Sequence, residues 1–228
     1  MHLTRLVLDA RNDDVRRDLS DANRLHQRVM SAFPDGLGED ARAKCGVLYR
    51  VESLGDQPVV LVQSAPVPDW SRLPKGWLAS TWDGAPPAAV RSLAKPWSDL
   101  LPGTVLRFRL LANASRKIDT ATRDGKRSNG QRVPLRTEAN ALAWLVRKGE
   151  MSGFGLVPSV TFPDRPDVAA TPHGSVRGAR KGGAITVEGV LFEGRLRVDD
   201  VGAFVLALQR GIGPGKAYGF GLLSIAQE

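Results

Sequence analysis

The spacing of apolar residues in the first half of the chain predicts a strand, a helix and a two-stranded hairpin. Residues 2–8 alternate apolar and polar side chains, as a half-buried strand does. Over residues 20–33 apolar side chains recur every three or four positions and share one helical face, and Ser20 or Asp21 can cap that helix. Residues 46–52 and 58–63 are two further strands joined by a short turn.

A proline-rich and tryptophan-rich segment follows. Residues 64–101 hold six prolines and four tryptophans without a clear period. Proline interrupts helices and central strands, so we predict an irregular connection with room for one further helix or strand.

The second half has a clearer order of elements. It predicts strands at residues 104–112, 154–161, 184–198 and 218–225, with helices at 137–148 and 199–210. The resulting βαββαβ order is typical of a ferredoxin-like fold, and the opening of the chain fits a second copy of that unit. We therefore predict an α+β protein of two tandem ferredoxin-like domains, residues 1–90 and 98–228.

Basic charge is concentrated in the second predicted domain. Residues 1–94 hold 12 Lys and Arg against 12 Asp and Glu, whereas residues 95–228 hold 20 against 12, which accounts for the net charge of +8. Arginine supplies 24 of the 32 basic residues, and its planar guanidinium binds phosphate through two hydrogen bonds and stacks on bases. This charge distribution predicts a polyanionic partner, with nucleic acid as the natural choice.

Two basic patches lie in that half. The first is a predicted loop after the strand at 104–112, and its cations are Arg116, Lys117, Arg123, Lys126, Arg127, Arg132 and Arg136. The second, residues 172–183, holds Arg177, Arg180 and Lys181, and its composition indicates the flexible tip of a basic hairpin. One such patch alone fits a solvated loop, but two in the half with all the excess charge favour nucleic-acid binding.

The C-terminal segment carries five glycines in eleven residues, 211–221, around the single lysine Lys216. It fits neither a Walker loop nor a dinucleotide loop, because Ala217 follows the lysine and the loop comes after a predicted helix rather than a strand. The glycines either expose successive N–H groups, such as those of Gly213 and Gly215, to a phosphate, or only allow the chain to turn tightly.

The scarcity of cysteine and histidine limits the available chemistry. Cys45 cannot form an internal disulfide, and its apolar neighbours favour a buried small side chain over a nucleophile. With His2, His26 and His173 it lacks the spacing of a zinc site, so we predict no metal and no cofactor. No apolar stretch approaches the roughly 18 residues of a membrane span and no signal peptide is evident, so we expect a cytoplasmic protein with no membrane partner.

Ribonuclease chemistry is within reach of these residues. RNA supplies its own nucleophile, the 2′-hydroxyl, so cleavage needs only a base, an acid for the 5′-oxygen and cations for the phosphorane. His26 lies at the edge of the apolar face of the helix at 20–33, beside Arg24 and Arg28. This makes His26 the best of the three histidines for catalysis, although a boundary histidine is also a common packing residue.

Short blocks spread over nearly the whole chain match the pattern of one family. They are the opening strand at residues 1–6, RRDL at 16–19 followed by Leu25-His26, NASRK at 113–117 with GKR at 125–127, VLFEGRLRV at 190–198, and GIGPGKAYGFGLL at 211–223. With these blocks the chain resembles the CasE family, the CRISPR repeat-processing endoribonucleases of type I-E Cascade complexes.

The resemblance implies tandem ferredoxin-like domains that bind the repeat hairpin of precursor RNA and cut at the 3′ base of its stem without a metal. It implies a 2′,3′-cyclic phosphate or 3′-phosphate end and retention of the product within Cascade. It also implies that His26 is catalytic, that residues 172–183 enter the major groove of the stem, and that the glycine loop lies near the RNA. Some members carry a tyrosine three residues before the histidine, where this chain has Asn23, so the second acid or base is Arg24, Lys216 or water.

Together these considerations predict a site with His26 as general base or general acid. The residues predicted to bind RNA are Arg24, Arg116, Lys117, Arg123, Lys126, Arg127, Arg177, Arg180, Lys181, Gly213, Gly215 and Lys216. The predicted partners are a CRISPR repeat hairpin and other Cascade subunits. The alternatives are a non-cleaving RNA-binding subunit of a ribonucleoprotein, which Asn23 keeps open, and a ribosome-associated ferredoxin-like module.

Overall fold

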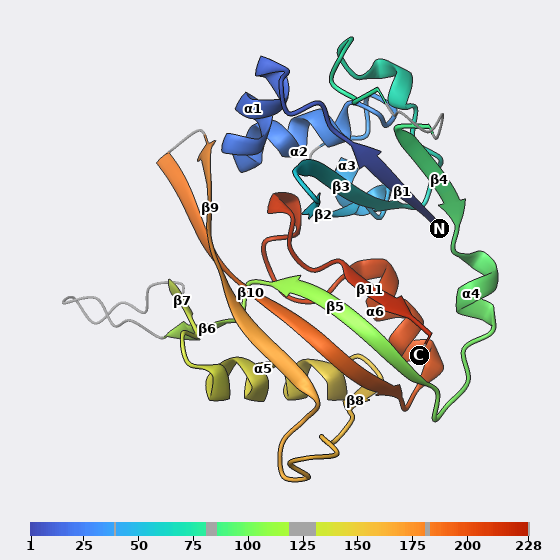
Figure 1. The fold of residues 1–228 in the computed structure, drawn as a ribbon, viewed down its shortest axis with the longest axis vertical. Coiled ribbons are helices and arrows are strands. Elements are labelled where there is room, and N and C mark those ends of the chain that lie inside the picture. The colour runs from blue at the N-terminus through green and yellow to red at the C-terminus, as the bar shows by residue number, and fades with distance from the viewer. Residues whose placement is uncertain (39, 81–85, 119–130, 181–182, 228) are drawn as a thin grey trace.

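The structure, a computed structural model, contains two antiparallel sheets and a small two-stranded ribbon (Figure 1). It describes residues 1–38, 40–80, 86–118, 131–180 and 183–227. Within these ranges no helix combines the length and the apolar character needed to cross a membrane.

The N-terminal sheet has the strand order β2-β3-β1-β4. Its strands are β1 (His2–Val7), β2 (Leu48–Leu54), β3 (Gln57–Ser64) and β4 (Ala88–Ser92). Between β1 and β2 lie α1 (Asp13–Ser20), α2 (Ala22–Met30) and α3 (Ala41–Lys44), and between β3 and β4 lies the short 3-10 helix η1 (Trp70–Arg72). Val15 of α1 and Leu25 and Val29 of α2 are buried in one core with Leu6 and Val60 of the sheet, so these helices cover one sheet face.

The C-terminal sheet has the order β11-β5-β10, with β8 and β9 both paired to β10. Its strands are β5 (Val105–Ala112), β8 (Phe154–Leu156), β9 (Val168–Arg180), β10 (Gly183–Val198) and β11 (Leu223–Ala226). The remaining elements are α4 (Ala94–Ser98), β6 (Ser115–Ile118), β7 (Gln131–Pro134), α5 (Glu138–Glu150), α6 (Val201–Arg210) and the 3-10 helix η2 (Lys216–Tyr218). Taking β8 and β9 together as the second strand, both sheets have the ferredoxin-like strand order, which confirms the predicted fold class.

Helix α2 follows the prediction closely because its start is encoded locally. The Asp21 carboxylate accepts hydrogen bonds from the N–H groups of Asn23 and Arg24, which would otherwise lack intrahelical partners. Helix α1 was not predicted, because Val15 is its only buried apolar side chain. Its start is stabilised instead by Asn12, whose side chain accepts from Asp14 and Val15.

Two predicted strands are shorter in the structure. The strand expected at 154–161 ends at Leu156, since prolines beginning with Pro158 follow, and the chain returns as β9, which was not predicted as a strand. The strand expected at 218–225 begins only at Leu223, because Gly215 and Gly219 adopt left-handed conformations at either end of η2.

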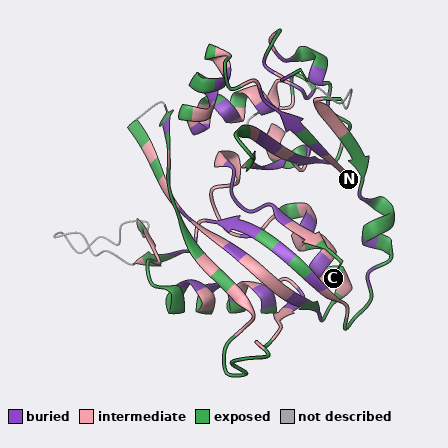
Figure 2. Ribbon diagram, viewed as in Figure 1, coloured by how far each residue is buried: buried purple, intermediate pink, exposed green. Residues whose placement is uncertain are grey.

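Described residues of both predicted basic loops lie in strands. Arg116 and Lys117 lie in β6, which pairs with β7 as a separate ribbon. Residues 172–180 belong to β9 and pair with β10, with a register shift at Gly189. We name residues 174–180 and 183–189 the β9–β10 arm, and it extends from the C-terminal sheet to helices α1 and α2 (Figure 1) with most of its surface exposed (Figure 2).

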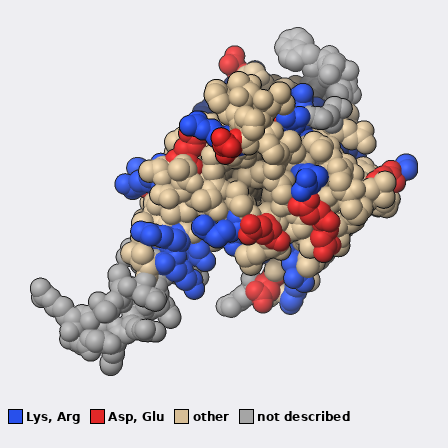
Figure 3. All heavy atoms as spheres, turned by 90° about the horizontal axis from the view of Figure 1, so that it is seen from below, with Lys and Arg blue, Asp and Glu red and all other residues tan. Residues whose placement is uncertain are grey.

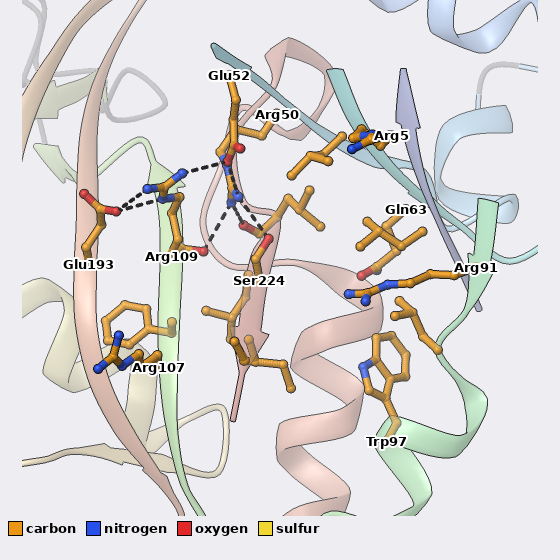
Figure 4. Close-up of a pocket in the computed structure, with 18 of the residues that line it drawn as sticks. Arg5, Arg50, Glu52, Gln63, Arg91, Trp97, Arg107, Arg109, Glu193 and Ser224 are labelled. Carbon is orange, nitrogen blue, oxygen red and sulfur yellow. Dashed lines mark hydrogen bonds and ion pairs between the residues drawn. The ribbon is translucent and has the colours of Figure 1, made fainter. Parts of the chain in front are cut away.

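A buried guanidinium joins the two sheets. Arg50 of β2 is only 2% exposed, and its Nη1 donates to the carbonyl oxygens of Leu222, at 2.9 Å, and Arg109, at 3.2 Å (Figure 4). Its Nη2 donates to Ser224 Oγ at 3.0 Å and its Nε to Glu52 Oε1 at 2.7 Å. A single side chain of the N-terminal sheet therefore satisfies backbone acceptors of β5 and of the residues around β11.

A groove of about 1110 Å³ opens beside Arg50 between the two sheets (Figure 4). Basic side chains from both sheets line it, including Arg5, Arg91 and Arg107, together with Trp97. None of its lining residues belongs to α2 or to the glycine loop, so the groove is separate from the His26 region.

We expect Arg50→Ala to lower the free energy of unfolding by about 3 kcal/mol, because it leaves buried carbonyl oxygens and Glu52 without their donor. Chemical denaturation would measure the change. Arg91→Ala, which removes an exposed arginine from the groove, is the control and should cost less than about 0.5 kcal/mol. Equal stability of the two variants would contradict the role assigned to Arg50.

Candidate active site

Helix α2 lies between two elements of the C-terminal half. It packs against η2, which contains Lys216, and against the end of β9. The N–H of Ala179 in β9 donates to Asp21 Oδ2 at 3.2 Å, which fixes the second contact. The sequence predicted that His26, Lys216 and the basic hairpin belong to one site. His26 lies on α2, and the tertiary fold brings the elements that carry Lys216 and the hairpin to this helix.

His26 is held against an aromatic ring. Its imidazole stacks with the ring of Tyr49 in β2, with centroids 6.5 Å apart and an interplanar angle of 19°. The Tyr49 hydroxyl donates to the carbonyl oxygen of Ala217 at 2.7 Å, which ties β2 to η2. His26 Nδ1 is buried and has no hydrogen-bond partner among the described residues.

The glycine loop, residues 211–221, depends on backbone conformations that other residues rarely adopt. Gly213 and Gly215 both have a φ of +82°. A Cβ at Gly213 would lie 3.1 Å from the Trp144 ring, and one at Gly215 would lie 3.1 Å from the Phe220 ring. In the described part of the chain, the N–H groups of Gly213, Gly215 and Lys216 donate to no protein acceptor. The loop therefore combines tight packing with N–H groups that donate to no described protein acceptor.

Cations converge on Lys216. Burial lowers the pKa of its ammonium, and the charges of Arg42, Lys148 and Arg210 lower it further. Burial also lowers the pKa of His26, with a second contribution from Arg42. No described carboxylate forms an ion pair with Lys216 or Arg42. A half-buried group of positive charges without paired acids is suited to binding an anion such as a phosphate.

Sequence reasoning missed two members of this site. Arg42 of α3 is anchored by donation from its Nη1 to the carbonyl oxygen of Val47 at 3.0 Å, and its own burial lowers its pKa. Tyr49 lies within the strand predicted at residues 46–52, where its position gave no sign of a role in the site. Neither residue stands in a motif with His26, so their roles depend on how α3 and β2 pack beside α2.

The predicted RNA-binding residues are spread over a longer surface. Arg24 is half-exposed with its Nε 3.7 Å from Asp18 Oδ1, and Arg177 is exposed on the arm. Arg116 and Lys117 are exposed on β6, near the base of the arm, where Arg136 Nη2 pairs with Glu188 Oε1 at 2.8 Å. Seen from below, a dense group of basic side chains covers the side where β6, β7 and the arm lie (Figure 3).

Some predicted residues fall outside what the structure describes. Arg123, Lys126, Arg127 and Lys181 lie outside the described residues, and so does the side chain of Arg180. The predictions for these five side chains therefore stay predictions.

The other candidate groups do not form a second site. Cys45 is buried, as predicted, although it lies between α3 and β2 rather than within a strand, and burial raises the pKa of its thiol. Across the described ranges, no three side chains of His, Cys, Asp or Glu lie together in a way that could hold a metal ion.

Comparisons with known proteins find matches over nearly the whole chain and over about half of it. The family model described as "CRISPR associated protein" matches residues 1–227. The chain is 38% identical over 232 residues to the CRISPR-associated endoribonuclease Cse3 of Thermus thermophilus, covering 99% of this chain and 100% of that protein. It is also 38% identical over 128 residues to the CRISPR system Cascade subunit CasE of Escherichia coli, covering 54% and 59% of the two chains.

A solved structure has the same fold. Thermus thermophilus Cse3 bound to an RNA representing a pre-cleavage complex superposes with a TM-score of 0.75 and 34% identity, covering 99% of this chain and 98% of that one.

We expect His26 to titrate below its ordinary pKa of 6.5, because burial and the positive charge of Arg42 both favour the neutral imidazole. NMR titration of the free protein would measure this, with His26→Gln assigning the resonance. Arg42→Gln should move the His26 pKa upward, since it removes a repulsive charge. A wild-type pKa at or above 6.5, or no shift in Arg42→Gln, would contradict the described electrostatics.

The same shift has a consequence for stability. The unfolded chain binds the His26 proton at a higher pH than the folded chain, so stability decreases as the pH falls from 6.5 toward the folded-state pKa. His26→Gln should remove this part of the pH dependence of the unfolding free energy.

Proposed function

This chain belongs to the CRISPR-associated protein family that its full-length matches define, and on that premise we propose that it is a metal-independent endoribonuclease of CRISPR repeat RNA. It binds the repeat hairpin in the precursor, cuts at the 3′ base of the stem and keeps the mature guide RNA as a Cascade subunit. The observation that supports this proposal is the packing of α2, which carries His26, against η2, which carries Lys216, and against the end of the basic arm.

In this mechanism His26 is the general base. Its lowered pKa keeps the imidazole neutral near pH 7, so a ring nitrogen can accept the proton of the 2′-hydroxyl as that oxygen attacks the adjacent phosphorus. The bond between phosphorus and the 5′-oxygen breaks, which leaves a 2′,3′-cyclic phosphate. Stacking on Tyr49 limits the orientations of the imidazole while this proton is taken.

Lys216 is the general acid in this mechanism. Its lowered pKa makes the ammonium a better proton donor to the departing 5′-oxygen than an ordinary lysine. Arg24 is a weaker candidate, because it is half-exposed and faces Asp18, and arginine hardly loses a proton in a protein. Arg42 and the amides of Gly213 and Gly215 stabilise the charge that develops on the phosphorane oxygens.

The RNA-binding surface extends from this centre. Arg177 and Arg180 of the arm, together with Lys181, bind the stem. The cations of and after β6, namely Arg116, Lys117, Arg123, Lys126 and Arg127, bind backbone phosphates together with Arg24. Side chains enter an A-form major groove only where it opens near a helix end, which fits a cut at the base of the stem. Binding through so many phosphates weakens steeply with salt.

The proposed division of the chain is residues 1–90, which carry His26, and residues 98–228, which carry the glycine loop and the basic elements. The burial of Leu93, Trp97 and Leu100 in the C-terminal core supports a boundary near residues 90–98. We propose that the protein acts on this precursor RNA in the cytoplasm.

A second candidate function is a subunit that holds guide RNA without cutting it. Asn23 favours this candidate, because some family members have a tyrosine at that position and an amide cannot exchange a proton as a phenol can. Cleavage assays separate the two candidates, since both predict tight hairpin binding.

We expect the wild type to cleave a repeat hairpin in EDTA, and His26→Ala to lower the single-turnover rate at least about 100-fold, because it removes the base. A hairpin deoxy at the nucleotide before the cut should bind but stay intact, since it lacks the nucleophile. Tight binding without any cleavage by the wild type would support the non-cleaving subunit instead.

The role of Lys216 is tested by changing the leaving group. Lys216→Met should slow cleavage at least about 100-fold, and a substrate with sulfur in place of the 5′-oxygen should restore its rate, because a thiolate departs without a proton. The same substrate should leave His26→Ala slow. Lys216→Arg keeps the charge but not the acid, so rescue by arginine would instead indicate a purely electrostatic role.

A further inference from the structure

One carboxylate holds the start of α2 and the end of the arm together. Asp21 Oδ1 accepts the N–H groups of Asn23, at 2.8 Å, and Arg24, at 3.2 Å, and thereby caps the helix. Asp21 Oδ2 accepts the N–H of Ala179 in β9 at 3.2 Å. The two oxygens of Asp21 therefore serve two elements that are more than 150 residues apart in the sequence.

The arm offers this N–H because β9 is an edge strand there. Ala179 pairs with Ala184 of β10 on one side, and its N–H points away from that partner. An edge N–H on an exposed arm would otherwise face solvent. Asp21 thus binds the backbone of the arm, and the exposed side chain of Arg177 on the same arm does not take part in this contact.

Gly178 brings the two backbones close enough for this bond. It is buried although it lies on an exposed arm, and a Cβ there would be 3.1 Å from the amide nitrogen of Asn23 and 3.3 Å from Asp21 Oδ1. Glycine within a strand often marks such a close approach of another backbone. A Cβ at position 178 would therefore require the arm or the first turn of α2 to shift by a few tenths of an ångström.

We propose that Asp21 is a positioning residue that locks the RNA-gripping arm to the catalytic helix and so determines which phosphate reaches His26. The inference rests on the proposed function and deepens it. His26 follows Asp21 by five residues, about one and a half helical turns, so a fixed start of α2 fixes the imidazole relative to the arm. The distance between the gripped stem and the catalytic base then sets the cleavage position.

This role separates binding from catalysis. The cations of the arm and of β6 remain in place when the Asp21–Ala179 bond is broken, so affinity for the hairpin is retained. The scissile phosphate, however, loses its fixed place beside His26, and a misplacement of about 1 Å can cost roughly 100-fold in rate.

Two variants disturb the contact between Asp21 and the arm, one at α2 and one at β9. Asp21→Asn keeps one oxygen, and asparagine is as good a helix cap as aspartate, but it cannot accept from Ala179 and from α2 at once. Gly178→Ala leaves Asp21 intact and strains the contact from the side of the arm, because its Cβ would lie 3.1 Å from the amide nitrogen of Asn23. Asp200→Asn is the matched control, because Asp200 caps α6 by accepting from the Ala203 N–H at 3.0 Å and is not bonded to the arm.

The experiment measures three quantities for each variant in EDTA. They are the single-turnover rate on a repeat hairpin with the cut mapped to the nucleotide, the affinity for the same hairpin deoxy at the cut, and hydrogen exchange at the Ala179 amide. We expect Asp21→Asn and Gly178→Ala to lose about 10- to 100-fold in rate with affinity within about 3-fold, and to cut partly at a neighbouring phosphate. The double variant should be no slower than the slower single variant, because both remove one contact.

The outcomes distinguish this inference from the proposed function. A wild type that binds the hairpin but does not cut it contradicts the proposed function. The Asp21–Ala179 hydrogen bond is still tested in that case, because the Ala179 amide should be protected from exchange in the wild type and lose this protection in Asp21→Asn. Cleavage by both variants at the wild-type rate and position would overturn the positioning role. So would parallel losses of rate and affinity, or an equal loss in Asp200→Asn.

Discussion

The arrangement of the molecule depends on the acceptors that surround the buried guanidinium of Arg50. A charged group at 2% exposure is stable only if its donors are satisfied, and most of its acceptors are backbone or side-chain oxygens of the C-terminal sheet. The N-terminal sheet is therefore held against β5 and β11 at a defined place. Gln63, whose Nε2 donates to the carbonyl oxygen of Leu208 at 2.7 Å, adds a second directional contact between the halves.

The candidate site at α2 depends on this contact between the two sheets. The helix belongs to the first sheet, whereas the glycine loop and the arm belong to the second, so the site is shared between two units that each have a core of their own. Tyr49 lies one residue before Arg50 in β2, and its hydroxyl binds Ala217 of η2. Strand β2 therefore carries both Arg50, which binds the C-terminal sheet, and Tyr49, whose ring stacks on His26.

The electrostatics of the site also follow from this assembly. Positive groups contributed by α3, α5, α6 and η2 approach one another, and burial lowers the pKa values of His26 and Lys216. Burial also lowers the pKa of Arg42, whereas the nearby carboxylate of Asp40 acts to raise it but forms no described ion pair with Arg42. Such an arrangement is unfavourable in the free protein and becomes favourable when a phosphate arrives, which is how preorganised sites stabilise transition-state charge. The carboxylates of α1 and of the start of α2 have other partners. Asp18 binds Arg28 and Trp77, and Asp21 binds the arm.

The sequence alone determined the properties that depend on neighbours along the chain. The period of apolar residues and the cap at Asp21 specified α2, the glycine spacing specified a tight C-terminal loop, and the charge count located the basic half. Strand β9 was not recognised because glycine, proline and small or polar residues fill most of it, so its sequence lacks the apolar alternation of a half-buried strand. Only the tertiary structure brought Arg42 and Tyr49 to His26 and Ala179 to Asp21, because these contacts depend on how two sheets dock, and no local pattern encodes that.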